Sequence, residues 1–247
     1  MKIREIKSKL KLEPPTFVCD KPLSKRATDP FENRSFFTVF VGQPRSGKTS
    51  HMISALTSSK VYNKVFDHIF VFMPEHSRKS MKKNPFRHIK QNQLYNELTH
   101  ANLKAVLDVM DESSSDDSDG EHEPSNNLII IDDMTIFLKQ HAVAALLTYI
   151  ILNRRHLRVS IMITVQYYNS LPMPIRKNIS SIVLCNKPVN NKELNNIQEE
   201  LFSMDKEDSL TVLKYCFQKP FDKLHTVLEP LQYYRNNNKL EIIKNDW

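Results

Sequence analysis

The sequence predicts an α/β fold in which a mostly parallel central sheet is flanked by helices. Three observations carry this prediction. Short runs of β-branched and aromatic residues alternate with stretches whose apolar residues recur at helical spacing, which is typical of parallel sheets covered on both faces. Residues Gly42–Thr49 match the pattern G-x-x-x-x-G-K-[ST], which joins a strand to a helix. The apolar run Leu128–Ile131 ends in two acids, as a buried strand that leads to a site does.

The elements follow in chain order. Phe36–Val41 is the strand before the segment Gly42–Thr49, which is a phosphate-binding loop, or P-loop, by its pattern. Met52, Ile53 and Leu56 recur at helical spacing after this loop. The other expected strands are Phe66–Met73, Leu128–Ile131, Val159–Val165 and Ile182–Cys185, and the other expected helices are Gln93–Met110, Phe137–Leu152 and Val189–Phe202. The helix Phe137–Leu152 is apolar nearly all round in its second half, so it is expected to be buried. The tail from Leu210 alternates and predicts a hairpin, and its polar end is expected to fray.

Composition divides the chain into an arm and one large domain. Residues 1–34 are basic and contain prolines, which predicts an extended N-terminal arm before a P-loop domain at 35–247. Within that domain, residues 111–127 hold seven acids and no Lys or Arg, which predicts a disordered acidic insertion. Because the chain still carries a net charge of +7, the rest is strongly basic and favours a polyanionic partner such as nucleic acid.

The same composition bears on the compartment. No apolar run approaches the length of a membrane span, and the first residues lack the apolar core of a signal peptide. The three cysteines are odd in number and widely spaced, which argues against a disulfide framework or a zinc site and favours a reducing compartment. Cys185 lies in an apolar run and is expected to be a small core residue.

The loop chemistry is that of a phosphate site. The chain has only three glycines, and two of them fall in this loop. Glycines let backbone N–H groups close around phosphate oxygens, and the following helix points its positive end at the same anion. Lys48 is expected to reach the β- and γ-phosphates and Thr49 to ligate Mg²⁺. The candidate nucleotide-binding residues are Gly42, Gln43, Pro44, Arg45, Ser46, Gly47, Lys48, Thr49 and Ser50.

Two acids follow the strand Leu128–Ile131. Asp132 would emerge at the carboxyl edge of the sheet beside the loop and hold Mg²⁺, through water or together with Thr49. Asp133 points differently and is a candidate general base that polarises the attacking water. Many ATPases of this kind place Glu at the second position, and Asp is one methylene shorter.

Polar groups at the next strand complete the candidate site. In P-loop ATPases with an inserted strand between the loop strand and the acid-tipped strand, a polar residue at its tip contacts the γ-phosphate or the water. Gln166 is in that place, and its amide can donate and accept at once. Arg154 and Arg155, in an arginine-rich turn, are candidate fingers reaching a neighbouring subunit's γ-phosphate. Arg176 is a weaker candidate for the same role.

Other P-loop classes fit less well. A GTPase would read guanine with Asn-Lys-x-Asp, but Val189 stands where Asn186-Lys187 would require the Asp. Small-molecule kinases carry an arginine-rich lid, which residues 78–90 could imitate, but need no acid pair followed by a sensor glutamine. A helicase would show more motifs and a second domain, for which there is little room.

The ordered motifs resemble the poxvirus-type genome-packaging ATPases of large DNA viruses, in the FtsK–HerA superfamily of DNA pumps. The resemblance covers about residues 36–190 and rests on the loop, Leu128–Asp133, the turn Asn153–Arg158, Thr164-Val165-Gln166 and Pro172–Lys177. It implies a RecA-like core, ATP and Mg²⁺ as cofactors, a homo-oligomeric ring, and translocation of double-stranded DNA into a preformed capsid.

Carried over by position, the resemblance makes Lys48 and Thr49 the phosphate and Mg²⁺ residues and Asp132 the metal-holding acid. Asp133 becomes the catalytic acid and Gln166 the sensor. It also implies a capsid or vertex protein as partner, and action in the host cytoplasm or virion. It gives no role to the acidic segment 111–127.

The basic stretch His76–Lys90 is the leading candidate for a DNA-contacting loop in the ring, with Phe86 as an apolar contact. A second function class stays open from the residues alone. It is a non-motor P-loop protein, either a nucleotide kinase or a nucleotide-switched assembly factor.

Overall fold

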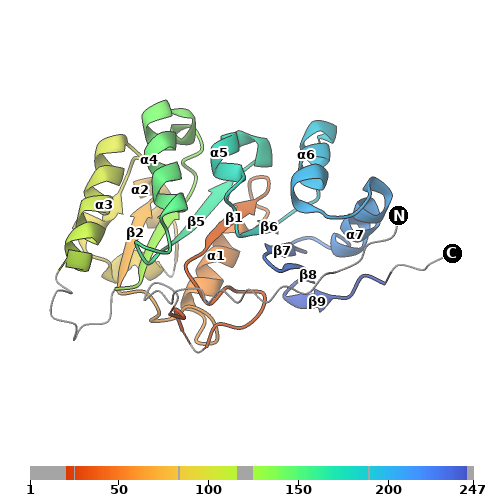
Figure 1. Cartoon of the computed structure of the whole chain (residues 1–247), viewed down its shortest axis with the longest axis horizontal. Coiled ribbons are helices and arrows are strands. Elements are labelled where there is room, and N and C mark those ends of the chain that lie inside the picture. Colours follow the sequence, from red (N-terminus) through yellow and green to blue (C-terminus); the bar gives the residue numbers. More distant parts are fainter. Residues whose placement is uncertain (1–20, 25, 83, 116–124, 189, 244–247) are drawn as a thin grey trace, which may run out of the picture.

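Alternating strands and helices build one sheet with helices on both faces (Figure 1). The computed structural model describes residues 21–24, 26–82, 84–115, 125–188 and 190–243. Within them the sheet has nine strands in the order β3-β2-β4-β5-β1-β6-β7-β8-β9. The strands are β1 (Phe37–Val41), β2 (His68–Phe72), β3 (Leu94–Tyr95), β4 (Asn127–Ile131), β5 (Val159–Val165), β6 (Ser181–Leu184), β7 (Leu224–Leu228), β8 (Leu231–Arg235) and β9 (Asn238–Leu240).

The first six strands pair in parallel, so their carboxyl ends meet at one edge. At that edge Val41 of β1 lies opposite Val165 of β5 on one side and Leu184 of β6 on the other. Strand β5 thus separates the loop strand β1 from β4, as the sequence predicts. Strands β7, β8 and β9 add an antiparallel meander beyond β6.

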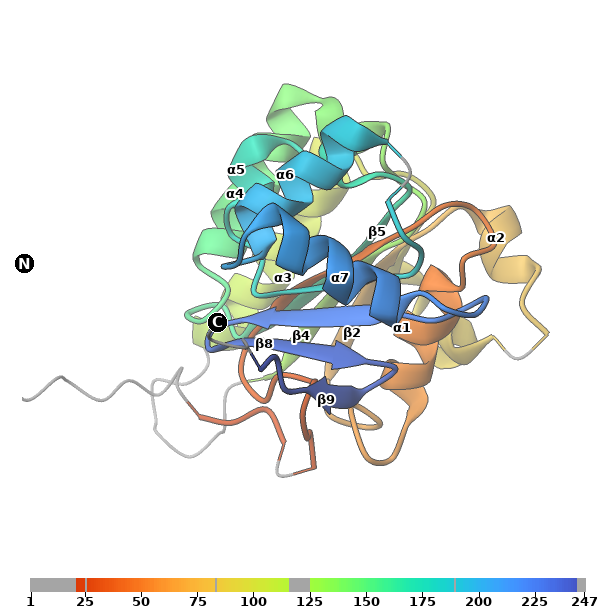
Figure 2. The same cartoon turned by 90° about the vertical axis from the view of Figure 1, so that its right-hand side faces the viewer.

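Helices occupy both faces, and their bounds are α1 (Lys48–Thr57), α2 (Glu75–Lys79), α3 (His100–Ser115), α4 (His141–Leu152), α5 (Met173–Arg176), α6 (Asn191–Leu201) and α7 (Lys206–Cys216). One-turn 3₁₀ helices lie at Pro85–His88, Gln91–Gln93, Phe137–Lys139 and Tyr168–Ser170. Figure 2 shows α3 to α7 on one side of the sheet and α1 on the other. None of the described helices is long and apolar enough to cross a membrane.

The central strands are apolar throughout because each is buried on both faces. Phe37, Val39 and Val41 of β1 pack into the core under α3, α4 and α6. Phe40, on the same strand, packs with Met52 of α1 into the second core, on the opposite face. Successive side chains of a strand point to opposite faces of the sheet. Because both faces are buried here, the sequence shows unbroken apolar runs instead of alternating apolar and polar residues.

Several sequence boundaries move in the structure. The predicted helix Gln93–Met110 is wrong at its start, because Leu94 and Tyr95 pair with β2 and the helix begins only at His100. Its cap is Thr99, whose hydroxyl accepts from the amide of Asn102 at 3.1 Å. The helix also runs on to Ser115, into the predicted acidic insertion, of which residues 116–124 lie outside the described residues.

The predicted burial of the helix before β5 is only half correct. In α4, Val143, Leu147 and Ile150 are buried, but Tyr149 is 52% and Leu152 60% exposed. One face packs on the sheet and the other is an exposed apolar surface.

The N-terminal arm is likewise not a free extension over its described part. Leu23 is buried, and the hydroxyl of Tyr62 donates to the carbonyl of Glu32 at 2.9 Å, so the described part of the arm packs on the core at these points. Residues 1–20 lie outside the described residues.

The tail contains a helix that the sequence analysis missed. Asp205 caps α7 by accepting from the amide of Asp208 at 2.8 Å, and Glu207 adds an acid in the first turn. The predicted hairpin is present as β7 and β8, and Asn238–Leu240 pairs with β8 where fraying was expected. Cys185 is buried as expected, and burial raises the pKa of its thiol to about 11.

Candidate nucleotide-binding site

The phosphate loop joins β1 to α1 at the carboxyl edge of the sheet, and its two glycines lie at close-packed or left-handed positions. A Cβ on Gly42 would lie 2.5 Å from Ser46 Oγ and 2.7 Å from Asn186 Oδ1, so both of these side chains would have to shift to admit one. Gly47 has a φ of 89°, the left-handed region that glycine adopts without strain. Asn186, after β6, also accepts from the amide of Gln43 at 2.8 Å and so helps to shape the loop.

The other loop residues lie where a phosphate-binding loop needs them. Gln43, Pro44, Arg45 and Ser50 are exposed, whereas Ser46, Lys48 and Thr49 are half-buried. The N-terminus of α1 carries no side-chain cap and no acid in its first turn. Its free N–H groups and positive dipole end therefore face the loop without a competing negative charge, as anion binding requires.

Lys48 folds back over the loop. Its Nζ donates to the carbonyl of Gly42 at 2.6 Å and to that of Gln43 at 3.0 Å. Burial lowers the pKa of this amine, and the negative groups Asp132 and Asp133 oppose that shift. The ammonium is thus held at the mouth of the loop by weak carbonyl acceptors that phosphate oxygens can replace.

Asp132 joins the loop to the neighbouring strands. Its Oδ1 accepts from Thr49 Oγ1 at 2.8 Å and from Thr164 Oγ1 at 2.6 Å. The side chain is almost fully buried, and this burial raises the pKa of the carboxyl, while the two hydroxyl donors lower it. A buried carboxylate bonded to the loop threonine has the position expected of the metal-holding acid.

The donor set suits Mg²⁺. A carboxylate and a hydroxyl are hard oxygen ligands, and Mg²⁺ is usually bound by one or two such groups plus substrate phosphates and waters. No group of three or more His, Cys, Asp or Glu in the described part of the chain could form a metal cage of its own. Thr49 and Asp132 therefore fit a metal that arrives with a nucleotide.

Thr164 is a site residue that the sequence analysis did not assign. It is buried at the end of β5, where its hydroxyl donates to Asp132 and accepts from the amide of Asp133 at 3.2 Å. It is thereby the one described side chain that bonds to both acids. The available signal was its position on the inserted strand two residues before Gln166.

Asp133 turns away from its neighbour, as the sequence predicts. It adopts a left-handed backbone conformation with a φ of 57°, and its side chain is exposed. Thr164 holds its amide, so this strained turn is fixed. The carboxylate is therefore accessible to a substrate water while Asp132 stays buried.

Gln166 lies at the tip of β5, next to the start of the phosphate loop. The amide of Gly42 donates to the carbonyl of Val165 at 3.1 Å, which ties the two segments together. Gln166, Gln43 and Asn186 line the same cavity of about 500 Å³. The structure therefore brings the exposed amide of Gln166 beside the loop, as predicted from the strand order.

Arg154 and Arg155 lie at the opposite edge of the sheet. They follow α4 and precede β5, whose first residue, Val159, donates to the carbonyl of Arg154 at 2.9 Å. Arg154 is half-buried and donates from Nη1 to Ile151 O at 3.0 Å, and burial lowers the pKa of its guanidinium. Arg155 is exposed and lines a cavity of about 610 Å³ at that edge. Neither arginine is close to the phosphate loop of its own chain.

Arg176, the weaker candidate, is used within the fold. Its Nη2 lies 3.1 Å from Glu200 Oε1, and its guanidinium sits 5.1 Å from the ring centre of Tyr168. It is buried by these contacts.

The basic stretch 76–90 begins at the same edge as the phosphate loop, after β2. Phe86, expected to be an apolar DNA contact, is 1% exposed and packs in the core beside α1, so that expectation is wrong. Arg78 is also buried and donates to Asn96. Among the described residues of the stretch, the exposed lysines and arginine are Lys79, Lys82, Arg87 and Lys90, of which Lys79 pairs with Glu75 at 2.7 Å. Lys83, another candidate DNA contact in this stretch, lies outside the described residues.

Comparisons with known proteins agree with this geometry. The DNA-packaging ATPase B204 of Sulfolobus turreted icosahedral virus has a TM-score of 0.59 at 15% identity, over 84% of this chain and 98% of that one. The genome packaging NTPase B204 of Sulfolobus turreted icosahedral virus 2, solved with AMP, gives 0.56 at 14% identity, over 85% and 98%. EssC (ATPases 2 and 3) from Geobacillus thermodenitrificans gives 0.55 at 12% identity, over 85% and 41%.

At these identities the solved structures show a shared fold. No curated protein sequence matches the chain significantly. The family described as Poxvirus A32 protein matches residues 24–224, from the described part of the arm to the first residue of β7. Because this match covers far more than half of the sequence, the chain belongs to the poxvirus A32 protein family.

Proposed function

We propose that this protein is an ATP-driven motor that translocates double-stranded viral DNA into a capsid. The carrying observation is the buried carboxylate of Asp132, bonded both to Thr49 of the phosphate loop and to Thr164 of the inserted strand. Membership of the A32 family supports the proposal. So do two solved structures of the same fold, one described as a DNA-packaging ATPase and one holding AMP.

Nucleotide binding follows from the loop. Backbone N–H groups of the loop around Gly47 and the uncapped N-terminus of α1 receive the phosphates. Lys48 exchanges two carbonyl acceptors for phosphate oxygens, which are charged and bind an ammonium more strongly. Mg²⁺, held by Thr49 and Asp132, would neutralise phosphate charge when bound.

Hydrolysis is assigned to the two exposed polar groups. Asp133 accepts a proton from the attacking water, because its carboxylate is accessible and its backbone is fixed by Thr164. Gln166 orients the same water by donating to the γ-phosphate and accepting from the water.

The arginines act between subunits in a homo-oligomeric ring. Since Arg154 and Arg155 lie at the far edge from their own phosphate loop, a catalytic role is open to them only in a neighbouring subunit's site. We place Arg155 in that role, because its side chain is exposed while Arg154 is half-buried against its own chain. The exposed Tyr149 and Leu152, just before this turn, supply apolar surface for such a subunit contact.

DNA contact is assigned to the exposed cations Lys82, Arg87 and Lys90, which can neutralise backbone phosphates without reading bases. Replacing all three by Gln should reduce DNA stimulation of the ATPase and flatten its salt dependence. The matched control replaces Lys104, Lys206 and Lys214, exposed lysines on α3 and α7. Unchanged stimulation in the first variant would refute this assignment.

The test of the function is ATPase activity with and without long duplex DNA. Wild type should hydrolyse ATP, and DNA should stimulate this activity. The proposed place of action is the host cytoplasm or the virion. Asp133→Asn should lose at least about 100-fold in kcat, the scale of a lost general base. Lys48→Ala should also lose ATPase activity, because it removes the ammonium that contacts the phosphates. Phosphorylation of a small acceptor without DNA would instead show a nucleotide kinase. Nucleotide binding with no turnover would show a switched assembly factor.

A further inference from the structure

A short loop at residues 217–223 connects α7 to β7 and lies beside the phosphate loop. Strand β7 is antiparallel to β6, and its first residue, Leu224, pairs with Leu184. Leu184 is also opposite Val41, the residue before the phosphate loop. The loop before β7 therefore arrives at the carboxyl edge of the sheet, where nucleotides bind in this architecture.

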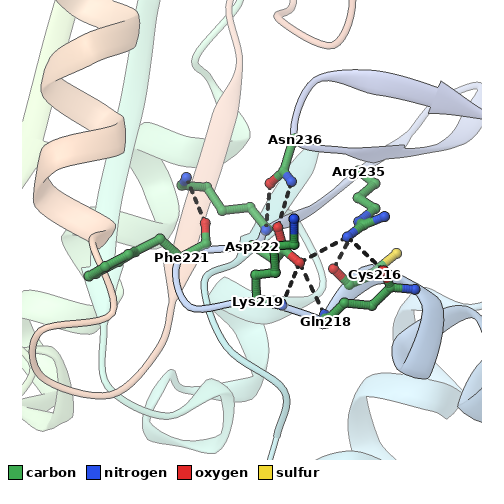
Figure 3. Close-up of polar contacts among 8 residues, drawn as sticks. Cys216, Gln218, Lys219, Phe221, Asp222, Arg235 and Asn236 are labelled. Carbon is green, nitrogen blue, oxygen red and sulfur yellow. Dashed lines mark hydrogen bonds and ion pairs between the residues drawn. The ribbon is translucent and has the colours of Figure 1, made fainter.

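Asp222 holds this loop in one conformation. Its Oδ2 accepts from the amides of Gln218 and Lys219 at 3.0 and 2.9 Å and from Arg235 Nη2 at 3.0 Å, while its Oδ1 accepts from Asn236 Nδ2 at 2.7 Å. The bonds from Asn236 and Arg235 hold the pKa of this carboxyl well below its usual range. Figure 3 shows the network on one side of the loop and Phe221 pointing away from it.

Phe221 precedes Asp222 in this fixed loop, and its side chain is exposed. Its side chain is 63% exposed, and its φ of 67° is a left-handed conformation that a bulky residue adopts only under strain. Its Cδ1 lies 3.5 Å from where a Cβ on Gly47 would be, so the ring reaches the last glycine of the phosphate loop. Strain of this kind at a fixed, exposed aromatic residue is a sign of function.

The neighbouring Lys223 ties the same residue to the site. Its Nζ donates to the carbonyl of Phe221 at 3.0 Å. Its charge also helps to lower the pKa of His51 in the first turns of α1, after the larger effect of burial. The backbone of Phe221 is thus held from both sides, by Lys223 and by the bonds of Asp222, beside the start of α1.

We propose that Phe221 is the base-stacking residue of the nucleotide site. A nucleotide with its β- and γ-phosphates on the loop carries its base beyond the α-phosphate, and the ring beside Gly47 offers that base an aromatic surface. The proposal rests on the proposed function of the loop as a nucleotide site. Stacking tolerates any base, because every base has a π-face. The site therefore takes ATP and GTP with similar affinity.

The experiment compares ligands with and without a base. Isothermal titration calorimetry gives the Kd of ATP, GTP and inorganic tripolyphosphate for wild type, Phe221→Ala, Phe221→Tyr and the control Val109→Ala, an exposed apolar residue on α3. Phe221→Ala should raise the Kd of ATP and GTP by about 5- to 100-fold and leave that of tripolyphosphate unchanged. Phe221→Tyr and Val109→Ala should match wild type.

The outcomes separate the stacking role from the loop itself. If Phe221→Ala weakens tripolyphosphate as much as ATP, the residue supports the loop and the stacking proposal is overturned. An unchanged Kd for ATP in Phe221→Ala, or a wild-type preference of more than about tenfold between ATP and GTP, overturns it as well. If wild type binds neither ATP nor tripolyphosphate, the proposed nucleotide site fails first, and the proposal falls with it.

Discussion

Thr164→Val tests whether one buried hydroxyl organises the two acids. The change keeps the shape of the side chain and removes its donor to Asp132, at 2.6 Å, and its acceptor for the amide of Asp133, at 3.2 Å. A bond to a charged group contributes about 1.5–3 kcal/mol and a neutral one about 0.5–1.5 kcal/mol. The free energy of unfolding at pH 7.5 should therefore fall by about 2–4 kcal/mol, which is a Tm lower by about 4–16 °C for a chain of this size.

The sign of the pH dependence separates this reasoning from a packing defect. Burial raises the folded-state pKa of Asp132 above its ordinary value, and Thr164 opposes the shift, so the variant raises that pKa further. A carboxyl group whose pKa is higher in the folded state than in the unfolded state contributes stability below the unfolded-state pKa. That contribution is lost as pH rises through the folded-state pKa. The deficit of Thr164→Val should therefore be largest at pH 7.5 and shrink as Asp132 is protonated toward pH 4.

Urea unfolding of the nucleotide-free protein at both pH values measures this deficit. Thr164→Ser keeps the hydroxyl and is the matched control. Thr164→Ser should retain most of the pH-dependent part of the free energy of unfolding and most of the ATPase activity. Thr164→Val should lose at least about tenfold in kcat/KM. An equal deficit at pH 7.5 and pH 4, or a Ser variant as impaired as the Val variant, would refute the assignment.

Two further predictions concern the loop and the core. Gly42→Ala would place a Cβ 2.5 Å from Ser46 Oγ and should raise the Kd of ATP at least about tenfold, with overpacking that costs about 1–3 kcal/mol; wild-type affinity in a titration would contradict the steric argument. Burial lowers the pKa of His225 to about 3 and that of His51 to about 4. The stability that these two neutral side chains contribute to the folded protein is therefore fully present above about pH 6.5 and is lost as pH falls toward those values. Neither ring nitrogen of His225 has a partner among the described residues, so His225→Phe should raise Tm at pH 5 more than at pH 7.5 in thermal melts. An equal change at both pH values would count against this.

The strands were predictable because their apolar runs are required by burial on both faces. Val159–Val165 matches the predicted strand end for end, and the ends of β1, β2, β4 and β6 each lie within two residues of the predicted ones. The loop and the acid pair were predictable because the chemistry fixes residue types at fixed spacing. These are local signals, and a single sequence contains them.

What was missed depends on pairing and packing across the chain. The local pattern places Leu94 and Tyr95 in a helix, whereas in the structure they pair with β2, which is distant in the sequence. The exposed face of α4 and the buried position of Phe86 depend on which neighbours the fold provides. Thr164 stands in the quoted Thr164-Val165-Gln166 motif, but its contact with Asp132 could not be predicted because it depends on the pairing of β5 beside β4. The role of Phe221 requires knowing that β7 runs antiparallel and returns the chain to the phosphate edge.

Strand β5 connects two places that a motor must coordinate. Its seven buried residues span about 20 Å at the rise of a strand, with Thr164 and Gln166 at one end and the arginine turn at the other. It pairs with β1 on one side and with β4 on the other. One continuous, hydrogen-bonded stretch of backbone therefore joins the edge of the sheet that holds the proposed sensor Gln166 to the opposite edge that holds the proposed finger Arg155.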